Sequence, residues 1–194
     1  MDGETIDILA SLAGCEAEVS KITEAAMAGE LDFFESLTRR VAFLKGVDAV
    51  KAKSRCADLP FIEGAGDIIK ELKGAGYKVV VFSGGFSMGT APAREKLGFD
   101  MDFSNKLHEK DGVLTGLVGG EMMYSNSKGV MLQKLQALLG VSIEDTIAVG
   151  DGANDASMFE FASKKIAFCA KPKLKEAANI VIDTKDLREI GKYI

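Results

Sequence analysis

Two aspartates stand where an apolar run ends: Asp151 follows Ile147-Ala148-Val149-Gly150 directly, and Asp155 comes four residues later. Open α/β sheets place their ligands where a strand ends and a helix begins, and carboxylate oxygens suit Mg²⁺. We therefore predict that Asp151 and Asp155 hold a metal ion. An ordinary Gly-Asp-Gly turn, with Asp155 capping the next helix, would show the same pattern.

A second β-branched run, Val79-Val80-Val81-Phe82, ends in Ser83, Gly84 and Gly85. Glycines allow the backbone to approach an anion, and a hydroxyl with N–H groups at the start of a helix forms a phosphate cradle. The segment is thus a candidate phosphate site. A plain turn between a strand and a helix is the alternative.

A third segment, Ser125-Asn126-Ser127-Lys128-Gly129, opens a predicted helix. A cation at the start of a helix opposes the helix dipole and is locally unfavourable. We therefore predict that Lys128 serves another purpose, such as neutralising a bound phosphate. A solvated surface lysine is the alternative.

These three segments, in this order, resemble the haloacid dehalogenase-like phosphohydrolases, and especially their phosphoserine phosphatase branch. The resemblance covers nearly the whole chain and includes Glu4-Thr5-Ile6-Asp7, the region from Phe33 to Val41, and the closing run from Ile166 to Pro172. It implies Mg²⁺-dependent hydrolysis of O-phosphoserine to serine and phosphate through an aspartyl-phosphate, in serine biosynthesis. It also implies that Asp151 binds Mg²⁺ and that Asp155 supports the ion directly, through water or through Lys128.

The resemblance further implies a substrate site with Lys128 as its catalytic lysine. Arg40 can grip a carboxylate through two parallel N–H bonds and Glu4 can accept an ammonium group, so the pair fits an amino acid. Without the resemblance, Arg40 would be interpreted as a solvated partner of Arg39, and Glu4 as an ordinary first-turn acid. The other substrate-binding residues that the resemblance implies are Met27, Phe33, Ser83, Gly84, Gly85 and Asn154.

One motif of that family does not occur in this sequence. The family's nucleophile and its acid/base aspartate lie in an Asp-x-Asp-x-Thr segment shortly before the Glu-Thr-Ile-Asp segment, and no such motif is found from Met1 onward. We therefore expect the 194-residue chain to be inactive, and a full-length form to be an active phosphomonoesterase. The alternatives are a non-catalytic relative that binds phosphate or an amino acid, and a phosphotransferase that uses another alcohol.

Composition narrows the possible partners. The chain is 47% hydrophobic and 27% charged, which is ordinary for a globular protein, and its net charge of -5 argues against nonspecific nucleic-acid binding. No apolar run approaches the roughly 20 residues of a membrane span and no signal pattern opens the sequence, so a cytoplasmic location is expected. The oligomeric state stays open.

The cysteines and the histidine exclude other chemistries. Cys15, Cys56 and Cys169 are widely separated and lack a Cys-x-x-Cys spacing, so they are expected to be reduced packing residues. His108 is the only histidine, which excludes a histidine-rich zinc site, and its strand-like surroundings favour a structural role.

The elements that must position these residues follow from periodicity. Residues 4–55 have helical spacing, whereas after Pro60 strands and helices alternate with short connections. We predict an α/β fold, a Rossmann-like parallel sheet core (59–194) with an inserted helical cap (1–58) and a small β-hairpin turning at Asp111-Gly112. The expected core elements are helices over 65–73 and 91–97 and from 128 and 155, strands at 79, 146–149, 166–168 and 180–182, and the hairpin over 103–118.

Overall fold

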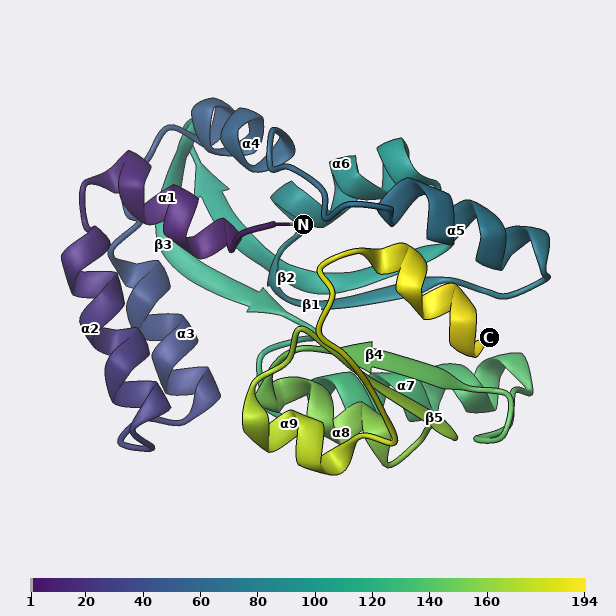
Figure 1. The fold of residues 1–194 in the computed structure, drawn as a ribbon. Coiled ribbons are helices and arrows are strands. Elements are labelled where there is room, and N and C mark those ends of the chain that lie inside the picture. Colours follow the sequence, from purple (N-terminus) through teal and green to yellow (C-terminus); the bar gives the residue numbers. More distant parts are fainter. Residues whose placement is uncertain (1) are drawn as a thin grey trace. The chain divides into compact units, whose positions relative to one another are not determined.

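The computed structural model describes residues 2–194 (Figure 1). The chain forms two compact units. Unit 1 consists of Met1–Phe61 and Tyr77–Tyr124, and unit 2 of Ile62–Gly76 and Ser125–Ile194. The boundaries between these units differ from the predicted boundary at residue 58. The strand and hairpin of residues 77–124 belong to the same unit as the N-terminal helices. The division into cap and core stays a prediction.

Unit 1 begins with four helices, which confirms the predicted helical region. Glycines in the left-handed conformation, Gly14, Gly29 and Gly46, separate the first helices because only glycine adopts that conformation without cost. Asp32 and Asp48 begin two of the helices by accepting hydrogen bonds from backbone N–H groups three residues later. The helices are α1 (Thr5–Ala13), α2 (Glu16–Met27), α3 (Phe33–Ala42) and α4 (Ala49–Ala57).

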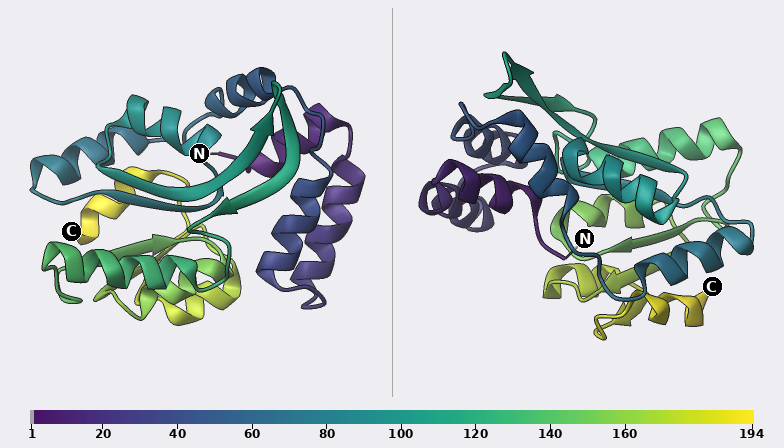
Figure 2. Two further views of the ribbon diagram at one scale, coloured as in Figure 1. Left: turned by 180° about the vertical axis from the view of Figure 1, so that it is seen from behind. Right: turned by 90° about the horizontal axis from the view of Figure 1, so that it is seen from above.

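The sheet of unit 1 has the order β1-β2-β3, with β1 parallel to β2 and β2 antiparallel to β3. Asp111 and Gly112, both at positive φ, form the turn of the predicted hairpin, whose long strands curve together in Figure 2. His108 lies exposed on this hairpin, with Nδ1 3.0 Å from Thr115 Oγ1. The elements are β1 (Val80–Phe86), α6 (Ser87–Leu97), β2 (Met101–Lys110) and β3 (Val113–Gly120).

Unit 2 holds a second, fully parallel sheet of order β4-β5-β6. Its core is a cluster of buried apolar side chains, Ile68, Ile166, Phe168, Ile182 and Ile190. The predicted parallel α/β architecture is thus confirmed, and the described residues divide it between two three-stranded sheets. The elements are α5 (Ala65–Gly74), α7 (Ser127–Leu139), β4 (Ile147–Gly150), η1 (Ala153–Asp155), α8 (Ala156–Phe159), β5 (Lys164–Phe168), α9 (Pro172–Ala177), β6 (Ile180–Ile182) and η2 (Leu187–Tyr193).

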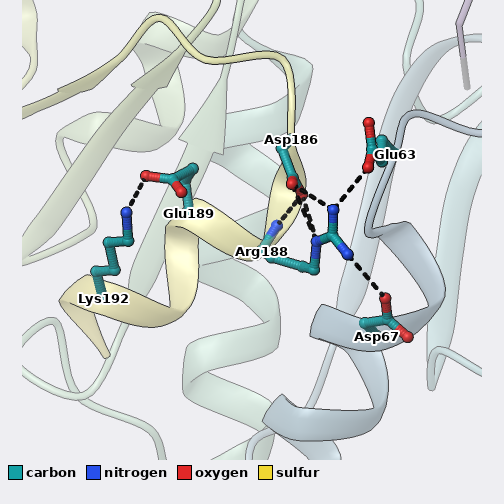
Figure 3. Close-up of polar contacts among 6 residues, drawn as sticks. All are labelled: Glu63, Asp67, Asp186, Arg188, Glu189 and Lys192. Carbon is teal, nitrogen blue, oxygen red and sulfur yellow. Dashed lines mark hydrogen bonds and ion pairs between the residues drawn. The ribbon is translucent and has the colours of Figure 1, made fainter.

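Arg188 joins the last helical segment, η2, to the start of α5 (Figure 3). Its Nη2 lies 2.6 Å from both Glu63 Oε1 and Asp186 Oδ2, and its Nη1 lies 3.9 Å from Asp67 Oδ2. Gly64 fits beneath this cluster at φ 74°, because a Cβ there would lie 2.5 Å from Asp186 Oδ1. All these charges are near water, so we expect the cluster to contribute little to stability.

The three cysteines are free, and two of them are buried in unit 1. Burial raises the pKa of the Cys56 thiol to about 11. The pKa of Cys15 is also raised, first by burial and then by the charges of Glu18 and Glu16. Cys15 and Cys56 are therefore packing residues as predicted, whereas Cys169 is exposed.

Among residues 2–194, no helix combines the length and the apolar character that crossing a membrane requires.

Candidate functional site

The segment Ser83–Gly85 forms a bulge at the end of β1. Ser83 pairs with Ser104 and Phe86 with the next residue of β2, so the two glycines between them have no partner on that strand. Bulges of this kind redirect groups near functional sites. The Gly85 N–H donates to Ser83 Oγ at 3.1 Å. The bulge therefore places the Ser83 hydroxyl next to backbone groups that do not pair with β2.

Gly85 also lies against the first residue of α1. A Cβ at this position would lie 2.7 Å from Thr5 Oγ1 and 3.2 Å from Ser83 Oγ, so only glycine fits. The hydroxyl of Thr5 is therefore a neighbour of the candidate phosphate site. Sequence analysis missed Thr5, because a threonine at the start of a helix is typical of a cap; its position directly after Glu4 was the only signal.

Arg40 is partly buried on α3, where its Nε donates to Ser36 O at 3.2 Å. Desolvation lowers the pKa of its guanidinium, while the negative charges of Glu4 and Asp7 raise it. Glu4 and Arg40 thus lie close enough for their charges to interact, and their roles in binding an amino acid stay predictions. Arg39 instead pairs with Glu35 at 2.5 Å on the surface, so the two arginines do not share a solvated face.

The two predicted pocket walls differ in their surroundings. Phe33 is partly buried against the core of unit 1. This packing alone explains why the residue is apolar, without a role in ligand binding. Met27 is 69% exposed at the end of α2, so core packing does not account for it. Both assignments stay predictions.

In unit 2 the ammonium of Lys128 lies 2.6 Å from Asp155 Oδ1. The side chains are only 11% and 4% exposed, which contradicts the interpretation of Lys128 as a solvated lysine. Asp155 Oδ2 accepts the N–H groups of Asp151 and Gly152, each at 2.9 Å. Asp155 therefore ties the turn after β4 to the first turn of α7.

Two glycines allow this close approach. A Cβ at Gly150 would lie 2.3 Å from Asp155 Cβ, and one at Gly129 would lie 2.3 Å from Ser157 O. The Gly129 N–H also donates to Ser157 Oγ at 3.1 Å, and that hydroxyl donates to Asn154 O at 3.2 Å. The backbone of Asn154 is thus fixed in the same turn as Asp151.

Asp151 carries a charge that its surroundings oppose. Although the residue is exposed, desolvation of its carboxyl group raises the pKa, the nearby charge of Asp155 raises it further, and Lys128 lowers it. A bound cation would offset this accumulation of negative charge. Among residues 2–194 no group of three or more His, Cys, Asp or Glu side chains could hold a metal. Mg²⁺ nevertheless fits, because it binds through one or two carboxylates, with water and substrate phosphates as its other ligands.

The predicted residues are divided between the two units. Glu4, Arg40 and the Ser83–Gly85 bulge belong to unit 1, and Lys128, Asp151, Asn154 and Asp155 belong to unit 2. The first group offers a hydroxyl and a cation for an amino acid and its phosphate. The second offers an ammonium and carboxylates for a phosphate and a metal.

The chain is similar to named proteins over its whole length. It is 63% identical to a phosphoserine phosphatase of Wolinella succinogenes and 52% identical to one of Methanocaldococcus jannaschii. Each match covers 100% of this chain, and 94% and 92% of the respective relative.

Solved structures agree with these matches. One described as a substrate-bound phosphoserine phosphatase complex, and another as a phospho-aspartyl intermediate analogue of phosphoserine phosphatase, each match with a TM-score of 0.93 and 52% identity. Each match covers 100% of this chain and 92% of the other. The family description for haloacid dehalogenase-like hydrolases matches residues 3–162. The chain therefore belongs to the haloacid dehalogenase-like hydrolase family.

Proposed function

We propose that this protein is a phosphomonoesterase that hydrolyses O-phosphoserine to serine and phosphate. The observation that supports this most directly is the buried Lys128–Asp155 pair, which is tied to the turn that carries Asp151. A buried cation beside two carboxylates suits a metal and a phosphate. Relatives that bear the name phosphoserine phosphatase and match the full chain support the choice of substrate.

The residues of this chain would act mainly by placing charge around the phosphoryl group. Lys128 would contact a phosphoryl oxygen, and Asp155 would hold its ammonium in place. The Ser83 hydroxyl would donate to another phosphoryl oxygen, next to Gly84 and Gly85. Such prearranged donors lower the cost of the charge that develops during the reaction.

Mg²⁺ would be held by Asp151, with Asp155 as the second acid. When bound, it would neutralise charge on the phosphoryl oxygens. Both oxygens of Asp155 already accept protein donors, which favours indirect support of the ion through Lys128 and the backbone of the turn.

Arg40 and Glu4 would select the amino acid. The guanidinium of Arg40 would bind the carboxylate, and Glu4 would accept the ammonium group. Met27 and Phe33 would form apolar walls and Asn154 would contact the substrate. These roles follow from the family resemblance together with the charges that unit 1 brings near one another.

By the same resemblance, the carboxylate that accepts the phosphoryl group belongs to an Asp-x-Asp-x-Thr segment, no copy of which occurs in the sequence. The full-length matches to phosphatases give no support to the expectation that the chain is inactive.

The test measures phosphate release from O-phosphoserine in the presence of Mg²⁺. The 194-residue chain is compared with the same chain carrying an added Asp-x-Asp-x-Thr strand at its N-terminus. We expect turnover by at least one of these two proteins, the active form. Phosphate binding without turnover by either would contradict the proposal and favour a non-catalytic relative. A new phosphate ester, formed when another alcohol is added, would favour a phosphotransferase.

Arg40→Ala should separate amino-acid recognition from phosphate recognition. Loss of a charge-assisted hydrogen bond costs about 1.5–3 kcal/mol, so kcat/KM of the active form for phosphoserine should fall by about tenfold or more. A simple aryl phosphate has neither carboxylate nor amine, so its hydrolysis should hardly change.

Arg39→Ala is the matched control for this measurement, because Arg39 is the neighbouring residue and pairs with Glu35 on the surface. We expect it to leave both substrates nearly unchanged. Equal losses for phosphoserine and the aryl phosphate in Arg40→Ala would mean that Arg40 supports the structure or the phosphate rather than the amino acid.

A further inference from the structure

We infer that Asn105 is a positioning residue for the phosphate-binding bulge Ser83–Gly85, an inference that rests on the proposed function. Asn105 lies on β2 and is completely buried. Its Nδ2 donates to Gly84 O at 3.1 Å and to Met122 O at 2.9 Å, and its Oδ1 accepts from Met122 N at 3.0 Å. Both amide hydrogens and the amide oxygen are therefore used by backbone atoms.

The bulge creates the need for such a residue. Because the pairing of β1 with β2 skips from Ser83 to Phe86, the carbonyl of Gly84 is outside the regular ladder. Gly84 is partly buried, and a carbonyl shielded from water needs a hydrogen-bond donor from the protein. The side chain of Asn105 supplies that donor, and its own backbone is the partner of Phe86 where the ladder resumes.

The amide of Asn105 has little freedom to move. Its partner on β3 is Gly120, at φ 149°, where a Cβ would lie 2.8 Å from Asn105 Cα and 2.9 Å from Asn105 Oδ1. On the other side, the two hydrogen bonds to the buried Met122 fix the rotation of the amide group. The position of the Gly84 carbonyl is thus set by a clamped side chain.

Fixing this carbonyl also orients the hydroxyl of Ser83. The C=O of Gly84 and the N–H of Gly85 belong to one planar trans peptide unit, so they point in opposite directions. The Gly85 N–H donates to Ser83 Oγ at 3.1 Å. Since that N–H approaches the oxygen, the hydroxyl hydrogen of Ser83 stays available to donate to a phosphoryl oxygen. Asn105 thus acts on the substrate through Gly84, Gly85 and Ser83 without touching it.

Asn105→Asp is the sharpest test, because it keeps the shape of the side chain. A carboxylate can still accept from Met122 N–H, but it cannot donate to Gly84 O or Met122 O and would repel both carbonyl oxygens. We expect the dissociation constant for inorganic phosphate to rise by about tenfold or more, the equivalent of about 1.4 kcal/mol or more. In the active form, kcat/KM should fall alike for phosphoserine and the aryl phosphate.

Gln136→Glu in unit 2 is the matched control. Gln136 is also a buried amide with two acceptors, since its Nε2 donates to Thr146 Oγ1 at 2.7 Å and to Phe161 O at 2.8 Å. The same exchange of amide for carboxylate should lower the melting temperature without weakening phosphate binding more than about twofold, or 0.4 kcal/mol.

The comparison decides whether Asn105 does more than stabilise the fold. If Asn105→Asp lowers the melting temperature as Gln136→Glu does, yet binds phosphate as the unchanged protein does, Asn105 is only structural and the inference is wrong. Asn105→Ser, which is neutral and smaller, replaces Asn105→Asp if that variant does not fold. Phosphate binding by an unchanged protein that does not hydrolyse phosphoserine would contradict the proposed function alone.

Discussion

Lys128→Ala is expected to cause a large loss of both stability and activity. The substitution leaves the carboxylate of Asp155, whose side chain is 4% exposed, without its cation. Removing one partner of a buried ion pair typically costs about 3–5 kcal/mol in the free energy of unfolding. The active form should also lose about a hundredfold or more in kcat/KM for phosphoserine and the aryl phosphate alike, since one lost donor to developing charge costs about that much.

Two further variants separate the loss of stability from the loss of activity: a substitution of a surface lysine, and a double variant of the buried pair. Lys53→Ala removes the pair with Glu109, whose side chains are 53% and 43% exposed, so it should cost less than about 1 kcal/mol. Lys128→Met combined with Asp155→Asn removes both charges while an amide oxygen still accepts the N–H groups of the turn. This double variant should regain stability, measured by urea unfolding, but not activity. Recovery of activity would show that Lys128 serves only to neutralise Asp155.

Asp151→Asn is expected to abolish metal binding without destabilising the metal-free protein. The raised pKa of this carboxyl group means that the folded state disfavours its charged form, so at neutral pH the charge costs stability and a neutral amide should not. In the unchanged protein, Mg²⁺ at 100 times its dissociation constant should add about 2.7 kcal/mol to the free energy of unfolding. Asp151→Asn should lose this increment together with activity.

The melting temperature with and without Mg²⁺ measures the effect on metal binding without relying on turnover. Asp145→Asn is the control, because Asp145 accepts from Ser142 on the surface of the same unit. It should keep the full response to Mg²⁺. An Asp151→Asn protein that still responds to Mg²⁺ would mean that the ion binds elsewhere.

Much of the fold could be predicted from sequence because its signals are local. Apolar spacing predicts the helices of residues 4–55, and Asp111-Gly112 marks a turn that requires two positive φ angles. The short helical segments α9 and η2 could not be predicted in the same way. They have only six and seven residues, too few for a clear periodic pattern, and η2 packs Ile190 and Leu187 against the core of unit 2, a long-range contact that local spacing does not reveal.

The candidate site shows the same division. The unfavourable place of Lys128 at the start of a helix indicated a special role, but its partner Asp155 lies 27 residues away and emerges only in the folded chain. Asn105 carries no signal of its own, since a polar residue in a strand is usually exposed. Its importance arises from a bulge in the neighbouring strand, which periodicity does not reveal.

The unequal surroundings of the three cysteines give the protein a built-in attachment point for a probe. The thiolate is the form of cysteine that attacks alkylating reagents, and burial with a raised pKa keeps Cys15 and Cys56 in the unreactive thiol form. Cys169 is exposed, and two residues further on the N–H of Lys171 donates to the carbonyl of Asp151. A fluorophore coupled at neutral pH would therefore be attached at Cys169, close to the turn that carries Asp151.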